Sequence, residues 1–410
     1  MANNKKQKEV PNGWQKIKIA DVCNVSAGGT PSTTKQEYWN GNIPWMNSGD
    51  LNKRIIFKVN GRITEQGLSS SSAKLVPVNS VLIGLAGQGK TRGTVAINKV
   101  KLTTNQSVAF FVPKRINYKF LYFNLYKRYI ELRQISAGDG GRGGLNLQLL
   151  KNLKLISPPL LEQNKIVKIL ETWDDYLEKI TKKIKTKKNI KRGLIKYLLS
   201  GRHRLFGFRD KWHIFKIEDI AEIKKGQDLS KDKLAVDGKY KCMLYGEIYT
   251  KYDEVASNIV SRTNYNEGIK SVKNDVLIPA STTTTAMDLA TATVVLEGNV
   301  LLGGDINIIR DKNDNFNGIF LSYYLTHIKK LALARLAQGI TIVHLYGKDF
   351  KKLKIELPSV KEQTAIADII ITTDQGIKLL EKRKKIIEDQ KKYLLNNLIT
   401  GKIRIPEFSK

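Results

Sequence analysis

The chain has 410 residues, more than one hydrophobic core usually supports, and 41% of them are apolar, so we expect at least two globular domains. Its 70 lysines and arginines against 38 acids give a formal charge of +32, which indicates a polyanion such as nucleic acid as the partner. No apolar run reaches the ~20 residues of a membrane helix, and the lysine-rich start lacks the apolar core of a secretory signal, so we expect a cytoplasmic protein.

The first part of the chain, residues 1–157, is predicted to form a β-rich domain with some helix. Short β-branched runs alternate with glycine, asparagine, serine and proline. Cys23 here and Cys242 in the second half lack the spacing of a zinc site or a disulfide framework, so we expect two buried thiols. The expected strands are Ser80–Ile83, Thr94–Ile97 and Val108–Val112, and the expected helix is Phe120–Gln134.

One segment of this domain, Gly84–Thr91, satisfies the P-loop pattern of nucleotide-binding proteins. A P-loop needs its Lys-Thr pair to open a helix, because the helix N-terminus binds the phosphate. Here Arg92–Ile97 follows, which indicates a glycine turn that enters a strand. We therefore interpret the segment as a loop that offers hydrogen-bond donors to DNA bases or phosphates.

A long helix is predicted over residues 158–201. Its apolar residues recur in alternating steps of three and four, which is typical of a coiled-coil seam, and Gly201 suits a left-handed C-cap. From Lys179 to Lys196 the helix carries many bases and no acid, which suits nearby phosphates or an acidic partner; for any single lysine, a solvated outer face of the coiled coil is an equal alternative. The seam residues are Ile166, Ile169, Trp173, Leu177, Ile180, Ile184, Leu194 and Leu198, and the candidate phosphate or partner contacts are Lys182, Lys183, Lys187, Lys188, Lys191 and Arg192.

A second β-rich domain is expected over residues 202–357. Its expected strands include Asp275–Ile278 and Ala292–Leu296, and its expected helix is Phe320–Ala337. Glu222-Ile-Lys224 offers a nuclease-like pattern without the usual Pro-Asp partner. The four histidines show no metal or triad spacing, so neither half has a visible catalytic site and we expect no bound metal.

A second long helix is predicted over residues 358–401, followed by a tail over 402–410. It begins with a capping box, Ser359 with Glu362, and ends at Gly401. Unlike residues 179–196 of the first helix, the matching stretch of the second helix includes acids. Its seam residues are Ile366, Ile369, Ile377, Leu380, Ile387, Leu394 and Leu398, and its acids include Glu381, Glu388 and Asp389.

The chain is an internal repeat. Residues 153–201 recur without gaps 200 positions later, and a block from Trp14 to Gly28 recurs 198 positions later. Neither long helix can bury its apolar stripe alone, so we expect an antiparallel coiled coil and a pseudo-twofold repeat with the β-rich domains at opposite ends. At ~1.5 Å per residue, helices of about 40 residues would cover about 18 base pairs of duplex.

The first domain carries a set of short stretches that are specific when they occur together, namely Ser26–Ser32, Tyr38-Trp39, Ile43–Trp45, Ile63–Ser69, Ala73–Pro77 and Asn105-Gln106. With these stretches and its repeat, the chain resembles, over nearly its whole length, the specificity (S) subunit of type I restriction-modification systems. The second domain departs from the family pattern, with Lys225–Asp228 where the first has Ala27–Thr30.

The resemblance implies an α+β fold in which two target recognition domains are each followed by a spacer helix. Each domain would read one half of a bipartite, asymmetric DNA site, and the helices would set the gap and dock two modification (M) subunits. Those subunits use S-adenosylmethionine to methylate adenine, and restriction (R) subunits, which use ATP and Mg²⁺, complete the complex. The chain itself would be non-catalytic and hold no cofactor.

Base-edge recognition favours arginine, lysine, asparagine and glutamine on loops, because these make paired hydrogen bonds with base edges. The candidates are Gln88, Lys90, Thr91, Arg92, Gln106 and Arg142 in the first domain, and Gln227, Tyr245, Arg262, Thr283 and His344 in the second. Three rival interpretations remain: a P-loop ATPase acting on DNA, a basic coiled-coil scaffold without sequence preference, and the specificity subunit of a system whose methyltransferase and nuclease are fused.

Overall fold

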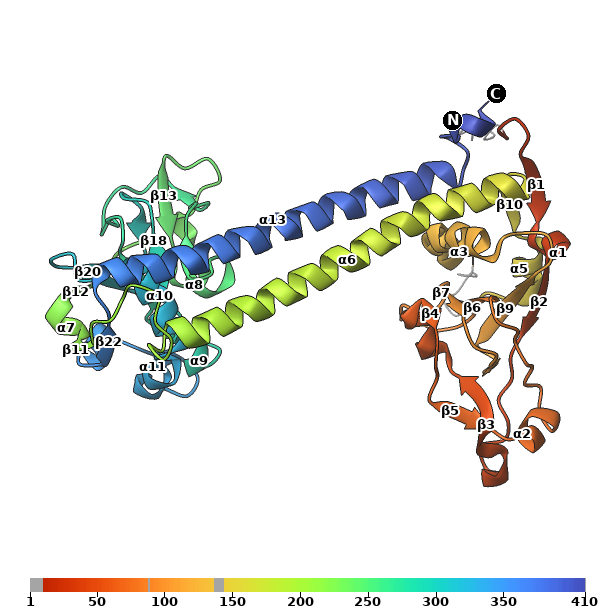
Figure 1. Cartoon of the computed structure of the whole chain (residues 1–410), viewed down its shortest axis with the longest axis horizontal. Helices are drawn as coiled ribbons and strands as arrows, with labels where there is room; N and C mark the ends of the chain where they lie inside the picture. Colours follow the sequence, from red (N-terminus) through yellow and green to blue (C-terminus); the bar gives the residue numbers. More distant parts are fainter. Residues whose placement is uncertain (1–9, 88, 136–143, 410) are drawn as a thin grey trace. The chain divides into compact units, whose positions relative to one another are not determined.

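The structure, a computed structural model, describes residues 10–87, 89–135 and 144–409 (Figure 1). The chain divides into two compact units, one formed by Met1–Ile180 with Arg383–Lys410 and the other by Thr181–Lys382. Each unit therefore holds one β-rich domain and a part of both long helices, α6 (Leu160–Leu198) and α13 (Val360–Leu398). No helix in the described part of the chain is long and apolar enough to span a membrane.

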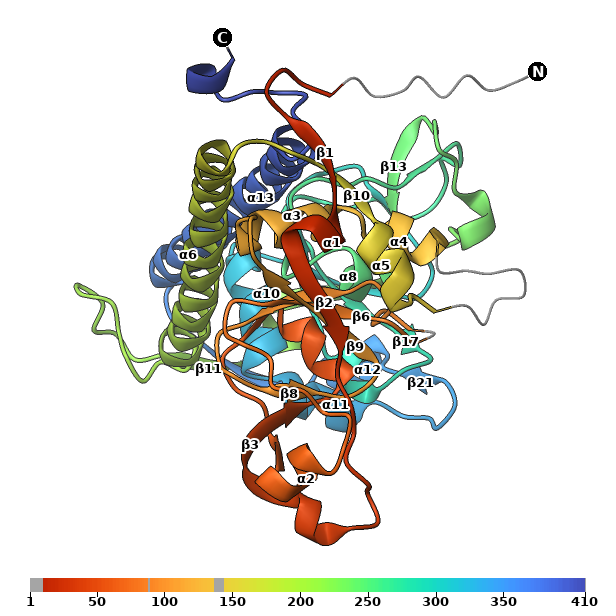
Figure 2. The ribbon, with the colours of Figure 1, turned by 90° about the vertical axis from the view of Figure 1, so that its right-hand side faces the viewer.

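The domain of the first unit is built on a five-stranded sheet of order β2-β9-β6-β7-β4. A three-stranded sheet, β5-β3-β8, adds a small lobe, and β1 pairs antiparallel with β10 (Figure 2). The strands are β1 Gln15–Lys18, β2 Cys23–Ala27, β3 Trp39–Met46, β4 Ile55–Ile56, β5 Gly61–Ile63, β6 Val81–Gly84, β7 Val95–Asn98, β8 Thr103–Thr104, β9 Val108–Pro113 and β10 Lys154–Ser157, and the helices are α1 Ile19–Val22, α2 Glu65–Ser69, α3 Tyr118–Lys127, α4 Tyr129–Ile135 and α5 Leu147–Asn152.

The domain of the second unit repeats this topology. Its five-stranded sheet has the order β12-β20-β16-β18-β14, its small sheet the order β15-β13-β19, and β11 pairs with β22 as β1 pairs with β10; a further pair joins β17 and β21. The strands are β11 His213–Lys216, β12 Ala221–Lys225, β13 Tyr240–Met243, β14 Val255–Ala256, β15 Arg262–Thr263, β16 Val276–Pro279, β17 Ser281–Thr282, β18 Thr293–Val295, β19 Leu301–Leu302, β20 Ile306–Asp311, β21 Val343–His344 and β22 Lys354–Leu357, and the helices are α7 Ile217–Ile220, α8 Tyr245–Thr250, α9 Ala286–Leu289, α10 Gly318–His327, α11 Lys330–Leu336 and α12 Gly347–Phe350.

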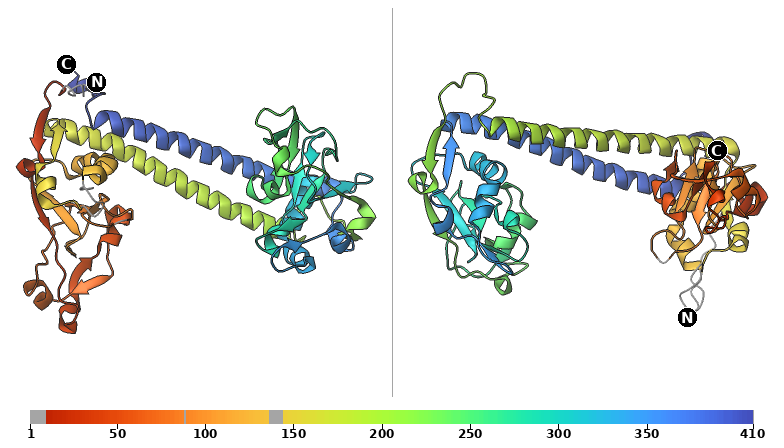
Figure 3. Two further views of the ribbon diagram at one scale, coloured as in Figure 1. Left: turned by 180° about the vertical axis from the view of Figure 1, so that it is seen from behind. Right: turned by 90° about the horizontal axis from the view of Figure 1, so that it is seen from below.

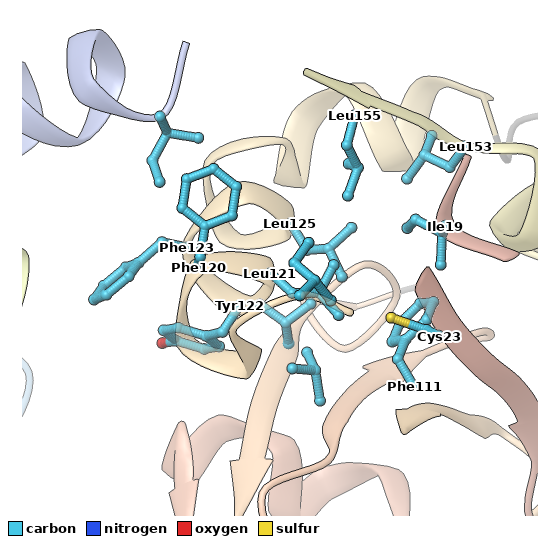
Figure 4. Packing of buried hydrophobic residues seen from close by; sticks show 14 of the residues in the cluster. Ile19, Cys23, Phe111, Phe120, Leu121, Tyr122, Phe123, Leu125, Leu153 and Leu155 are labelled. Carbon is cyan, nitrogen blue, oxygen red and sulfur yellow. The ribbon is translucent and has the colours of Figure 1, made fainter. Parts of the chain in front are cut away.

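The core of the first unit lies between the five-stranded sheet and α3. Figure 4 shows Leu121 and Leu125 of α3 converging on Ile19 and on Phe111 of β9, and all four side chains are fully buried. Burial of such side chains removes apolar area from water and stabilises the fold by ~25 cal/mol per Å². The same cluster takes in residues of both long helices and the residue that follows α13, namely Ile166, Val167, Leu170, Leu395 and Leu398, and Ile399.

The two long helices pack antiparallel within each unit (Figures 1 and 3). In the first unit Asp174 of α6 pairs with Lys391 of α13. In the second unit Lys188 and Lys191 of α6 pair with Glu381 and Asp374 of α13, each at 2.7 Å. Residue numbers therefore rise along one helix as they fall along the other, which confirms the predicted antiparallel pairing and the predicted repeat.

The predicted strands and helix ends are largely confirmed. Both predicted C-caps are left-handed, with φ of +67° at Gly201 and +68° at Gly401. The predicted helices Phe120–Gln134 and Phe320–Ala337 are each two helices, because the chain turns after His327 and at Arg128, where ψ is 14°. The sequence hides these breaks, since the second helix of each pair buries a leucine in the same core as the first, Leu132 in one unit and Leu333 in the other.

The capping box predicted at the start of α13 is wrong, because the Glu362 carboxylate binds an arginine side chain instead. Both oxygens of Glu362 accept hydrogen bonds from the Arg204 guanidinium, each at 2.6 Å, and the Glu362 side chain is 1% exposed. The predicted buried thiols are confirmed for Cys23 and Cys242, and burial raises the pKa of Cys23 to about 12.

Candidate nucleic-acid interface

Several loops meet in each unit at the end of one central strand, β6 or β16. In the first unit the Leu85 amide donates to the Ser107 carbonyl (2.8 Å), and the Leu85 carbonyl accepts from the Leu145 amide (3.0 Å). In the second unit Ala280 bonds in the same way to Asp305 (2.8 Å) and Leu345 (3.0 Å). We call these regions the loop edges; they comprise residues 27–30, 85–87, 89–94, 105–107 and 144–146 of the first unit, and residues 225–228, 280–285, 303–305 and 343–348 of the second.

The loop edge of the first unit carries most of its predicted DNA contacts. Lys90 and Gln106 are exposed, whereas Thr91 and Arg92 are half-buried. Lys90 to Gly93 form a turn that leads into β7, so the expected strand is confirmed and the helix that a P-loop needs is replaced by a strand.

The backbone of this turn is held by α4. The Tyr129 hydroxyl donates to the Lys90 carbonyl at 3.1 Å, and the Arg133 guanidinium donates to the Gly89 carbonyl at 2.7 Å. The Thr94 hydroxyl adds a bond to the Lys90 carbonyl at 2.6 Å. Fixing the backbone while leaving the Lys90 side chain in solvent presents its ammonium to a ligand at a low conformational cost.

The residues typical of recognition domains hold the small lobe together. The rings of Trp39 and Trp45 meet edge to face at 5.0 Å, and their indole nitrogens donate to the carbonyls of Ser32 (3.0 Å) and Gly29 (3.2 Å) respectively. Next to them Thr30 donates its hydroxyl to the Gln106 side-chain oxygen at 2.5 Å. The aromatic residues of the motif are thus structural, and they position Gln106 through the loop that they anchor.

In the second unit Gln227, Thr283 and His344 lie on the loop edge. Gln227 and Thr283 are exposed, and β21 places His344 opposite Ser281. The half-buried His344 ring stacks on Tyr346, with centroids 5.4 Å apart and planes 11° apart.

The other predicted contacts lie elsewhere. Tyr245 begins α8 and packs, partly buried, against the core beneath the small sheet. Arg262 lies on β15, where its guanidinium donates to the Gly238 carbonyl at 3.3 Å. Gln88 and Arg142 lie outside the described residues.

The predicted basic face of α6 is only partly available. Lys182, Lys183, Lys187 and Arg192 are exposed, and Lys188 is half-exposed and pairs with Glu381 at 2.7 Å. For Lys191 a phosphate or partner contact stays a prediction. Its ammonium already lies near Asp374 and Glu254 and 5.1 Å from the Tyr323 ring centroid.

Sequence reasoning missed a matched pair of buried contacts at the helix ends. Glu162, 1% exposed, binds the Arg404 guanidinium at 2.8 and 3.0 Å, as Glu362 binds Arg204. The recurrence of Glu162 as Glu362 was the visible signal. The arginines follow each helix three residues after its glycine cap, so their partners could only be identified from the folded structure.

Comparisons with known proteins agree with this architecture. Two copies of a family domain, the type I restriction modification DNA specificity domain, match residues 11–189 and 209–389. The MjaVIII type I restriction enzyme specificity subunit of Methanocaldococcus jannaschii is 24% identical over 97% of this chain and 94% of its own length. The EcoR124I/EcoR124II specificity subunit of Escherichia coli is 30% identical over 40% of this chain and 41% of its own length.

Two solved structures share the fold. The S subunit of a type I restriction-modification system from M. genitalium matches with a TM-score of 0.59 and 17% identity, over 96% of this chain and 97% of that one. The HsdS subunit of Thermoanaerobacter tengcongensis matches with a TM-score of 0.55 and 14% identity, over 97% and 99%. With its repeat, its paired helices and two family domains that span most of its length, the chain belongs to the type I restriction-modification specificity subunits, the non-catalytic DNA-recognition subunits of these systems.

Proposed function

We propose that each unit reads one half of a bipartite, asymmetric DNA site through its loop edge. One observation carries this proposal. The backbone hydrogen bonds of Leu85 and Ala280 are equivalent, so the two loop edges share one scaffold, yet the side chains on the two loop edges are quite different. The first unit presents Lys90, Arg92 and Gln106, whereas the second presents hydroxyl-rich residues 281–285 with Gln227 and His344. One scaffold with two sets of donors and acceptors suits the recognition of two different base sequences.

The partners follow from the family. We propose that the chain docks two modification subunits, which bind S-adenosylmethionine and methylate adenine, and that restriction subunits using ATP and Mg²⁺ join the full complex. The exposed bases Lys182, Lys183, Lys187 and Arg192 suit phosphates or an acidic partner surface, and α6 and α13 would set the gap between the half-sites. A cytoplasmic location follows from this function.

The test is to co-express the chain with its modification subunit and to map methylated adenines across a genome. A gapped, two-part motif is expected. Thr283→Ala with Gln227→Ala should relax only one half of that motif, and Lys90→Ala with Gln106→Ala only the other, because removing the hydrogen bonds to one base costs about 1–3 kcal/mol of discrimination. Deletion of residues 212–357 should abolish the motif.

The matched control is Lys273→Gln, since Lys273 is exposed and lies before β16, at the end remote from the loop edge. This variant should leave both halves of the motif unchanged. A single unbroken motif, or the same change of motif from substitutions in either unit, would contradict the proposal.

A further inference from the structure

Tyr346 is the centre of a small basic cluster on the loop edge of the second unit. Its ring is 37% exposed and stacks on His344. The ammonium of Lys225 lies 5.8 Å from the ring centroid and that of Lys348 lies 5.9 Å from it. Two lysines from separate segments, one ending β12 and one in α12, therefore gather around one aromatic ring.

The first unit has no such cluster at the equivalent place in its described residues. The strand registers match β12 with β2, and the bonds of Leu345 and Leu145 match the starts of α12 and α5. The residues at the positions that correspond to Lys225, Tyr346 and Lys348 are Ala27, Asn146 and Gln148.

On the loop that follows the central strand, the first unit has cationic side chains and the matching segment of the second unit has none. In the first unit this loop carries Lys90 and Arg92, whereas in the second unit the corresponding segment Ser281–Thr285 contains only hydroxyl side chains. Both loop edges therefore carry two cations, but on different segments of the same scaffold. A surface that binds duplex DNA needs cations for the phosphates whichever bases it reads.

We propose that Lys225 and Lys348 are the phosphate contacts of the second unit, with Tyr346 as the positioning residue that orients their ammonium groups. This assignment rests on the proposed function and adds three residues to its DNA-binding surface. The one carboxylate facing Lys225 among the described residues belongs to Asp305, at 3.9 Å, and the side chains are 56% and 46% exposed. Water screens such a pair strongly, so it leaves Lys225 available to a phosphate.

The experiment measures binding of the complex of this chain with its modification subunits to two duplexes of equal length. One duplex carries the methylated motif of the wild-type complex and the other a scrambled sequence. Each phosphate contact contributes about −0.9 to the slope of log binding constant against log salt concentration. The variant Lys225→Gln with Lys348→Gln should make this slope shallower by about 1.8 on both duplexes.

Three further variants separate electrostatic contact from structure. Lys225→Arg with Lys348→Arg should keep the wild-type slope, because the charges remain. Tyr346→Leu should make the slope shallower while Tyr346→Phe, which keeps the ring, should not. The control Lys273→Gln with Lys312→Gln removes the same charge from the opposite end of the sheet and should change the slope much less.

The methylated motif should be unchanged in the double glutamine variant, since phosphate contacts carry no sequence information. A slope equal to that of the control, or a changed motif, would overturn this assignment while leaving the two-part motif of the wild type intact. Absence of a two-part motif in the wild-type complex would instead refute the proposed function itself.

Discussion

Glu254 is a carboxylate of the second unit that is 9% exposed and lies beside a histidine and a lysine. His327 Nε2 lies 2.6 Å from one of its oxygens and the Lys191 ammonium lies 3.8 Å from the other. Although burial raises the pKa of Glu254, the hydrogen bond with His327 and the charge of Lys191 lower it below the ordinary value of 4.5. The ionised carboxylate therefore stabilises the folded unit.

A pH dependence follows from this lowered pKa. The stabilisation is fully present above pH 4.5, the unfolded value, and is lost as the pH falls through the lower folded-state pKa. We expect Glu254→Gln to reduce the acid sensitivity of the second unit, measured as the thermal unfolding midpoint between pH 6 and roughly pH 3. The exposed control Glu267→Gln should keep the wild-type profile, and an unaltered profile in Glu254→Gln would contradict the assignment.

The Glu162–Arg404 contact predicts a marked non-additivity. Removing one partner of a buried ion pair leaves an uncompensated charge and costs about 3 kcal/mol. Arg404→Met should therefore lower the free energy of unfolding by that amount in urea denaturation, and adding Glu162→Gln should recover part of it. The Trp14 indole, which donates to Glu162 at 3.1 Å, can still donate to the glutamine oxygen. If the two substitutions were additive, the pair would not be coupled in solution.

At the scale of the helices, the heptad pattern predicted the seam but not everything the helices bury. Ile166, Ile180 and Ile184 are buried as expected. Val167 and Leu170 are buried as well, because this part of α6 packs both on α13 and on the domain of its own unit. Periodicity detects a single apolar stripe, so a second contact face contributed by a distant segment escapes it.

The sequence predicted less of the candidate DNA-binding site than of the long helices. Loop composition singled out Lys90 and Thr283, and the structure places both on the loop edges. Lys225, which we propose as a phosphate contact, was missed because it meets Tyr346 from a segment more than 100 residues earlier in the sequence. Spacing along the chain contains no information of that kind, and only the shared topology of the two sheets shows which positions correspond.

Replacing glycine by alanine should have opposite effects on the free energy of unfolding at the two helix caps and inside α13. Gly201→Ala should lower the free energy of unfolding by about 1–2 kcal/mol, because an L-residue is strained in the left-handed region. Gly401→Ala should cost more, since the new methyl would lie 2.4 Å from Pro11 Cγ. Gly376→Ala, in the exposed middle of α13 with nothing within 4 Å of the new methyl, should raise it by about 1 kcal/mol. Chemical denaturation of the three variants measures the change in the free energy of unfolding of each and so checks their predicted order. Equal losses at Gly201 and Gly401 would refute the clash with Pro11.

At the scale of the molecule, residues from both ends of the described chain belong to the same unit. Arg404 donates to the Asn12 carbonyl at 2.8 Å, and Lys165 pairs with Glu407 at 3.2 Å. Ile405, 9% exposed, and Phe408 pack against the core of the first unit. Residues 402–409 thus contribute to the packing of a domain whose sheet was completed some 290 residues earlier, at β9.

Truncation after Gly401 should therefore weaken the first unit selectively. It removes the partner of buried Glu162 and uncovers apolar side chains of the core cluster, whereas the second unit keeps its own Arg204–Glu362 contact. Hydrogen exchange followed by mass spectrometry should show reduced protection in β1 and α3, with unchanged protection in β11 and α10, their counterparts in the second unit. The second unit serves as an internal control in the same molecule. An equal reduction of protection in both units, or no reduction in either, would show that residues 402–409 do not act through the contacts of Arg404 and Ile405.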